Sequence, residues 1–192
     1  MMRNSKLLSA CFIAATLSVA GSIAQAETRV PTTVMKNAAE TRILDDRVAV
    51  TLPPDFRKMP TAQIPGAYPT ANPRPKEVWY ADTSKGVVSL AFLFPFPGKL
   101  LKDEHVPRLA EMMKKQMANQ KPTLTTKKIN EHTVSRLGSV AADASGSGGQ
   151  VYTITQLASF NNRLMMVTFN IPVPLKDDYL TTGEAILDSL VW

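Results

Sequence analysis

The fold of this chain is decided by residues 151–171, which read VYTITQLASFNNRLMMVTFNI. Asn161 and Asn162 form a strong tight-turn signal, because asparagine tolerates the left-handed backbone that such turns require. Beyond the turn the sequence alternates with the period of two that is typical of strands. One face of this second strand carries Met165, Val167, Phe169 and Ile171, and the other carries Leu164, Met166, Thr168 and Asn170. The stretch therefore predicts an antiparallel hairpin.

Further strands are predicted on the N-terminal side of this hairpin. Residues 48–52 alternate apolar and other side chains, and Pro53-Pro54 ends the strand. Residues 77–81 and 87–94 flank a turn at 82–86 that contains a glycine, which is typical of a second hairpin. Residues 124–134 read as a polar, Thr-rich strand and residues 137–145 as a weaker one, followed by a flexible Gly146–Gly149 turn.

The clearest helix is predicted over residues 103–120. Its apolar side chains recur at helical spacing, which predicts that Val106 and Met113 are buried while Glu104 and Lys115 face water. Asp103 is expected to cap the helix, Pro107 lies in the first turn, and Pro122 stops it.

A final helix is predicted from Asp177 or Asp178, as its cap, to about Leu190. Gly183 lies in the middle of its apolar face, where a missing side chain lets a helix approach a sheet closely. The apolar face consists of Leu180, Ile186, Leu187 and Leu190. Strands, one helix, several antiparallel strands and a closing helix predict an α+β fold, a mainly antiparallel sheet flanked by helices.

The N-terminal residues predict export. Two cations, Arg3 and Lys6, precede an apolar run that ends at an Ala-x-Ala signature, so residues 1–26 are expected to be a cleavable signal peptide. We therefore expect a periplasmic protein, with an irregular lead-in at 27–41 and one domain over 42–192. The only cysteine, Cys11, would leave with the signal, which excludes a disulfide or a thiol nucleophile from the mature chain.

The charge balance and the prolines exclude some classes of function and structure but do not identify the function. The chain carries 22 basic and 16 acidic residues, a mild excess that does not indicate nucleic-acid binding. Residues 53–75 contain seven of the fourteen prolines, which excludes an interior helix or a central strand there. A long surface loop of this kind is either functional or a passive connector, and the sequence leaves both open.

On this order of elements the chain resembles the PsbP/DcrB-like family, whose fold is an antiparallel sheet sandwiched by helices. The likeness is carried by residues 48–53, by helix 103–120 after a hairpin, by the Asn161-Asn162 hairpin, and by the closing run 186–190. It would cover residues 42–192, although the segment 53–75 is longer and denser in proline than the family pattern. The resemblance implies accessory or adaptor proteins of the envelope that bind macromolecules and share no catalytic site.

Two groups of side chains are candidates for partner binding. Tyr68, Phe94 and Phe96 are aromatics of the Pro-rich loop and of the Phe94-Pro95-Phe96-Pro97 strand end, where exposed rings make interface anchors. Lys114 and Lys121 belong to a stretch, 108–128, in which six cations meet one acid, Glu111. That stretch fits an acidic partner or peripheral contact with an anionic membrane. A solvated helix face accounts for the same charges.

The sequence gives little support for a catalytic site or a metal site. The two histidines, His105 and His132, have no metal-ligand spacing, and no G-x-S-x-G or phosphate-loop motif occurs. We expect no cofactor and no metal. The leading interpretation is a non-enzymatic periplasmic accessory or adaptor protein that binds another envelope protein. Two alternatives stay open: a hydrolase or other enzyme with an unrecognised site, for which His105 and His132 are the candidate bases, and a periplasmic immunity protein against a secreted toxin.

Overall fold

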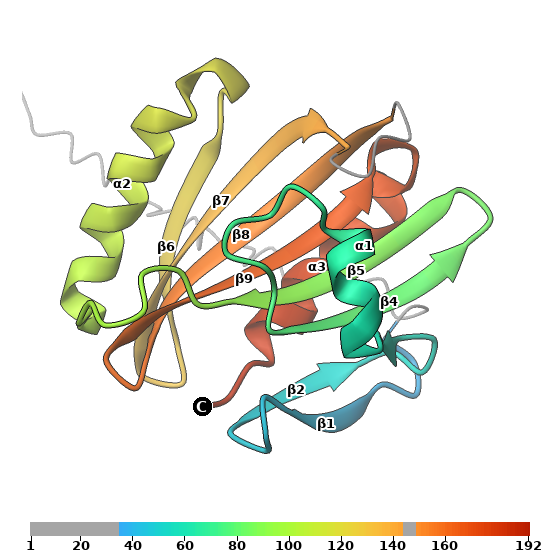
Figure 1. The fold of residues 1–192 in the computed structure, drawn as a ribbon, viewed down its shortest axis with the longest axis horizontal. Coiled ribbons are helices and arrows are strands. Elements are labelled where there is room, and N and C mark those ends of the chain that lie inside the picture. Colours follow the sequence, from blue (N-terminus) through green and yellow to red (C-terminus); the bar gives the residue numbers. More distant parts are fainter. Residues whose placement is uncertain (1–34, 144–148) are drawn as a thin grey trace, which may run out of the picture.

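The computed structural model describes residues 35–143 and 149–192. Within these residues a seven-stranded sheet of order β3-β4-β5-β9-β8-β7-β6 lies beside a two-stranded sheet, β1-β2 (Figure 1). Every neighbouring pair is antiparallel, which confirms the predicted α+β class. The strands are β1 (Ala39–Ile43), β2 (Val48–Leu52), β3 (Arg57–Lys58), β4 (Glu77–Thr83), β5 (Gly86–Leu93), β6 (Thr123–Ile129), β7 (His132–Ala142), β8 (Gln150–Phe160) and β9 (Arg163–Pro172). The α-helices are α1 (Ile64–Ala67), α2 (Val106–Gln116) and α3 (Lys176–Asp188).

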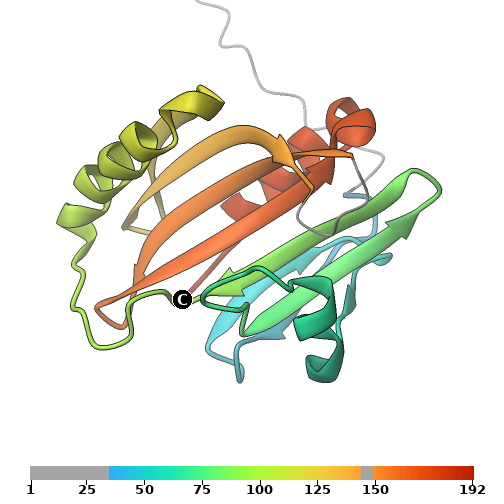
Figure 2. The same cartoon turned by 45° about the horizontal axis from the view of Figure 1, so that its top comes forward.

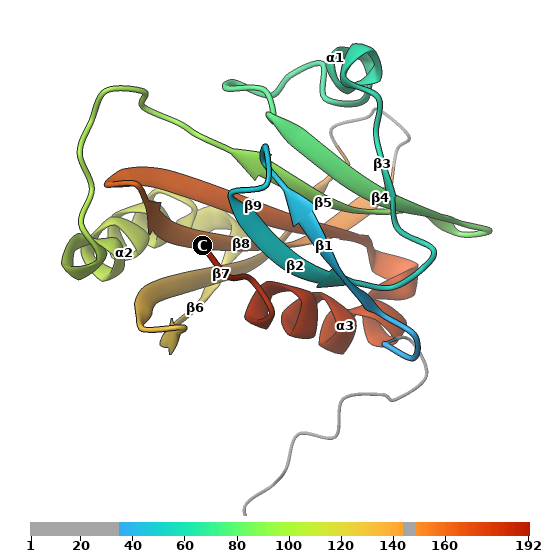
Figure 3. The ribbon, with the colours of Figure 1, turned by 90° about the horizontal axis from the view of Figure 1, so that it is seen from below.

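The two faces of the large sheet are covered by different elements. The β1-β2 hairpin and α3 lie on one side of the sheet and α1 on the opposite side (Figure 3). The predicted alternation of β9 is confirmed: Met165, Val167, Phe169 and Ile171 are fully buried in the core that α3 and the hairpin cover. Leu164 points to the other face, where it packs with Val106 and Ala110 of α2.

Helix α2 has the predicted phase but a shorter α-helical body. Val106 is fully buried and Met113 half-buried, while Glu104 and Lys115 are exposed. Single 3-10 turns at 103–105 and 118–120 flank the α-helix. The predicted cap at Asp103 is wrong, because that residue lies inside the first 3-10 turn and its carboxylate is 3.0 Å from His132 Nδ1.

Helix α3 approaches the sheet where the sequence predicts. A Cβ atom placed on Gly183 would lie 2.5 Å from Phe169 Cε1 and 3.0 Å from Cγ, so the glycine allows the contact. Ile186, Leu187 and Leu190 are fully buried, and Leu180 is half-buried. Asp177 and Asp178 lie in the first turn and neither caps it by a side-chain hydrogen bond, so the predicted cap is wrong. Their charges still favour that helix end electrostatically.

Two predicted boundaries are also wrong. Residues 124–134 form two strands, because Asn130 and Glu131 adopt left-handed backbone angles and turn the chain between β6 and β7. The predicted irregular lead-in at 27–41 overlaps β1, which begins at Ala39 and pairs with β2. The predicted signal peptide, residues 1–26, and residues 144–148 of the predicted glycine-rich turn lie outside the described residues.

The Pro-rich segment 53–75 contains short elements only, consistent with the exclusion of a central strand or long helix. It holds the two-residue edge strand β3, a 3-10 turn at 61–63 and the four-residue α1. Ile64 of α1 packs on Val78 and Ala91 of the sheet. Over the described ranges, no helix combines the length and the apolar composition needed to cross a membrane.

Candidate protein-binding surface

The surface centres on the corner that follows β5, residues 94–97. Phe96 has a left-handed backbone (φ 58°) and is 58% exposed as a residue, whereas Phe94 is half-buried and packs on Phe160 with ring centroids 5.8 Å apart. Two cavities flank this corner, and both are lined by Pro95, Phe96 and Leu164. Phe96 therefore stands on the ridge between them.

An apolar groove of about 360 Å³ lies on the α2 side of the corner. We call it the apolar groove; it is lined by Asn72, Pro73, Leu93, Pro95, Phe96, Leu109, Met112, Met113, Gln116, Leu164 and Met166. It forms because α2 covers one end of the sheet face and the Pro-rich loop covers the other, as Figure 2 shows, with β5 and β9 between them. Its size falls in the range of ligand pockets, about 300–1,000 Å³. Methionine side chains adapt to varied apolar partners.

A second cavity of about 440 Å³ lies on the other side of the corner. We call it the basic pocket, because three cations, Arg47, Lys76 and Arg163, stand among the rings that line it. The Arg47 guanidinium lies over the Phe160 ring, 5.4 Å from its centroid, which is a cation–π distance. The pocket thus combines positive charge with aromatic walls.

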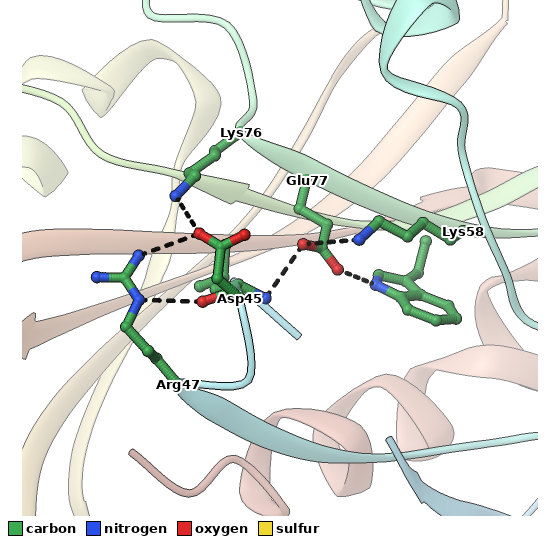
Figure 4. Close-up of polar contacts among 7 residues, drawn as sticks. Asp45, Arg47, Lys58, Lys76 and Glu77 are labelled. Carbon is green, nitrogen blue, oxygen red and sulfur yellow. Dashed lines mark hydrogen bonds and ion pairs between the residues drawn. The ribbon is translucent and has the colours of Figure 1, made fainter. Parts of the chain in front are cut away.

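The β1-β2 turn positions two of these cations (Figure 4). Arg47 Nε donates to the Leu44 carbonyl at 3.1 Å, and its terminal nitrogen lies 3.7 Å from an oxygen of Asp45. The Lys76 ammonium donates to Asp45 at 3.0 Å. This hydrogen bond and the charge of Lys76 hold the pKa of Asp45 below its usual value, with a smaller effect from Arg47. Asp45 is therefore ionised at neutral pH and offsets one of the three cations.

A buried carboxylate fixes the hairpin beneath this turn. Glu77 is 6% exposed; its Oε2 accepts from the Leu44 backbone N–H at 3.1 Å and from Lys58 Nζ at 3.2 Å. Its Oε1 accepts from Trp79 Nε1 at 2.8 Å. Three donors on one buried acid join β1-β2, β3 and β4, as Figure 4 shows. The small sheet, and with it Arg47, is held in place by this contact.

The structure brings together two of the five residues singled out from the sequence. Phe94 and Phe96 both line the basic pocket. Tyr68 lies half-buried against Ile64, Val78 and Ala91, and its hydroxyl is 3.1 Å from Ser89 Oγ. Burial raises its pKa, partly opposed by hydrogen bonds from Ser89 and Asn170.

The two lysines singled out from the sequence lie apart from both cavities. Lys114 is in the last turn of α2, and Lys121 follows the 3-10 turn in a left-handed conformation, so neither lines the groove or the pocket. Their role in binding stays a prediction. Lys127, from the same basic stretch, pairs with Asp188.

Sequence reasoning missed Arg47, Lys76, Arg163 and Met112. Each is an ordinary surface residue in the sequence, and no local spacing relates the three cations. One signal was present: Arg163 directly follows the Asn161-Asn162 turn, and an antiparallel pair places it opposite Phe160.

The histidines do not form a catalytic site with the cavities. His132 meets an acid, Asp103, and stacks on Trp192 with centroids 4.8 Å apart. His105 is exposed beside Glu104, and neither ring lines the two cavities. Across residues 35–143 and 149–192, no group of three or more His, Cys, Asp or Glu side chains could hold a metal ion.

Comparison with known proteins gives likeness of fold at low identity. No family model matches the chain, and no curated protein matches it. The solution structure of cyanobacterial PsbP (CyanoP) from Synechocystis sp. PCC 6803 is similar over 80% of this chain and 91% of its own, with 8% identity and a TM-score of 0.47. A crystal structure from Bacteroides thetaiotaomicron VPI-5482 has 10% identity and a TM-score of 0.47, covering 80% of this chain and 48% of its own.

The Ran-binding protein Mog1p of Saccharomyces cerevisiae is similar over 81% of this chain and 95% of its own, with 10% identity and a TM-score of 0.41. All three structures are similar to this chain with TM-scores below 0.5. At such identities the likeness concerns shape and leaves ligands and partners to be argued from the residues of this chain.

Proposed function

We propose that this chain is a non-catalytic accessory or adaptor protein of the periplasm, related to the PsbP/DcrB-like family, that binds another envelope protein. The observation that carries the proposal is the apolar groove, together with the exposed apolar residues beside it. Phe96 is 58% exposed and Met112 52%, and both line the groove. Leu100, four residues beyond Phe96, is 83% exposed.

Exposed apolar side chains beside a concave groove have the character of an interface. A single exposed apolar residue is common on protein surfaces, but Phe96 and Met112 line the same apolar cavity, and contiguous exposed apolar surface marks an interaction site. The ring of Phe96 stands on a backbone corner between prolines, so little conformational entropy is lost when a partner packs on it. Aromatic anchors in such positions carry much of the energy of protein interfaces.

We propose that this protein has no catalytic activity of its own. A general base must reach its substrate within hydrogen-bond distance or through one water. The histidines lie outside both cavities, and the groove is lined mostly by apolar side chains. A surface of this composition suits binding better than acid–base chemistry.

Site-specific photo-cross-linking in living cells tests the proposal. A photoreactive amino acid is placed at Phe96 or Met112, and at Val87 as the control. Val87 is a 47% exposed apolar residue near the far end of β5, about 20 Å from Leu93 along the strand. We expect a protein adduct of defined mass from Phe96 and Met112 and none from Val87. Equal labelling at all three positions, or none at any, would contradict a specific partner surface.

Export is tested separately by fractionation and by the mass of the mature chain. The proposal expects the protein in the periplasmic fraction with Glu27 as its first residue. If the chain retains residues 1–26 and is found in the cytoplasmic fraction, the proposed location in the periplasm and the proposed envelope partner are both contradicted.

A further inference from the structure

The basic pocket adds a chemical requirement on the partner. It contains three cations, Arg47, Lys76 and Arg163, and one carboxylate, Asp45, pairs with the first two. Among the described residues no ion pair joins Arg163 to an acid, and Arg163 is exposed. The pocket therefore keeps an excess of positive charge that its own residues do not neutralise.

Part of this charge is held in place before any ligand arrives. Arg47 is fixed by its bond to the Leu44 carbonyl and by the Phe160 ring beneath it. Preorganised cations lose less entropy when they bind an anion, and a guanidinium matches the two oxygens of a carboxylate.

The basic pocket and the apolar groove meet at Pro95, Phe96 and Leu164. A ligand lying across Phe96 would thus meet an apolar surface on one side and an excess of cations on the other. We propose that the partner presents an acidic side chain to the basic pocket and neighbouring apolar side chains to the groove. This inference rests on the proposed function, because it describes the segment that occupies the same surface.

The arrangement favours a protein segment over a membrane surface. Asp45 and Asp46 are exposed on the turn that carries Arg47, and a plane of lipid phosphates would meet these acids together with the cations. A single carboxylate needs to reach only Arg163, the cation of the pocket that Asp45 does not pair with.

The test uses the full chain with the photoreactive residue at Met112, which lines the groove but not the basic pocket. It is combined with Arg163→Glu, Arg163→Lys, or Lys85→Glu, a charge reversal in the exposed β4-β5 turn. We expect Arg163→Glu to lower the adduct yield roughly tenfold, a change of about 1.4 kcal/mol. Arg163→Lys and Lys85→Glu should stay near the wild-type yield. The cross-linked peptide should contain Asp or Glu beside apolar residues.

Each other outcome decides between the two proposals. An adduct whose yield is unchanged by Arg163→Glu, or whose peptide has no acid, would overturn the acidic-segment inference and leave the partner surface intact. A phospholipid adduct would replace the protein segment by a membrane. Loss of the adduct in all variants, the wild type included, would refute the proposed function itself. Thermal melts check folding, because a change at the exposed Arg163 should leave the melting temperature close to that of the wild type.

Discussion

Replacing Gly183 by alanine should destabilise this protein, although alanine favours helices. Glycine inside a helix costs about 1 kcal/mol relative to alanine, so an open site would gain that amount. Here the new Cβ would lie 2.5 Å from Phe169 Cε1 and 3.0 Å from Cγ, well inside ordinary contact distances of about 3.5–4.0 Å. The question is which of these two effects is larger.

The surroundings of Phe169 decide the magnitude. The ring is fully buried and stacks on Phe56, with centroids 6.2 Å apart, so it cannot swing into solvent to relieve the contact. Overpacking a core of this kind costs about 1–3 kcal/mol, and we take the upper part of that range because several ring atoms are too close. After the gain in propensity, Gly183→Ala should lose about 1–2 kcal/mol, a fall in Tm of roughly 2–8 °C. Gly183→Leu should lose more.

Chemical and thermal unfolding of a small set of variants measures this balance. Glu184→Ala and Glu184→Gly both remove the same carboxylate from an exposed neighbouring position, so their difference gives the helix propensity without the packing. Gly183→Ala combined with Phe169→Leu should be less destabilised than the sum of the single changes, by about 0.5–3 kcal/mol. If Gly183→Ala melts at or above the wild-type temperature, the close packing of α3 on β9 is refuted.

Three further predictions concern the polar contacts. Glu77→Ala should lower the free energy of unfolding by about 3–5 kcal/mol, because it leaves the buried N–H of Leu44 and the Trp79 indole N–H without their acceptor. Lys58→Ala should lower it by less than about 1 kcal/mol. Equal losses for the two variants in urea melts would contradict this. Asp188→Ala should destabilise the protein more than Arg136→Met, because it leaves the buried Arg136 guanidinium without its carboxylate. A lower Tm for Arg136→Met than for Asp188→Ala would exclude that reasoning. The pKa of Tyr68 is higher in the folded than in the unfolded protein. Its contribution to stability is therefore fully present below the unfolded-state pKa of about 10, and it is lost as the pH rises through the folded-state pKa. Tyr68→Phe should therefore reduce the loss of stability at alkaline pH and remove a late step from the absorbance titration, and an unchanged titration would disprove it.

Periodicity predicted the parts of the fold that depend on one element and its immediate contact. The alternation of β9 and the phase of α2 follow from which side chains are apolar, and burial then fixes their orientation. The close approach at Gly183 was also predictable, because a glycine in the middle of an apolar helix face lowers helix propensity and is favoured where a side chain would collide with the sheet. The turn at Asn130-Glu131 was missed, since the polar residues around it show neither a glycine nor a change of periodicity.

The predicted cap at Asp103 failed because this side chain has another partner in the fold. Asp103 reaches His132 on β7, a residue 29 positions later, instead of its own helix. Such contacts depend on the tertiary structure and leave no local pattern. The same holds for the candidate surface: Phe94 and Phe96 were visible as aromatics at a strand end, but the cations around them come from other parts of the chain.

The order of these contacts explains why the candidate surface lies at this corner. Glu77 fixes the β1-β2 turn to the start of β4, and that turn places Arg47 over Phe160, one residue before the β8-β9 turn. The same corner ends β5, so the chain leaves the sheet there through two prolines and exposes Phe96. The β1-β2 turn, the residue before β4 and the start of β9 thus supply the three cations, and the corner after β5 supplies the ring. Helix α2 and the Pro-rich loop leave the adjoining sheet face open as a groove. A partner bound across this corner would contact the loops and α2 and would leave the buried core of α3 and β9 unchanged.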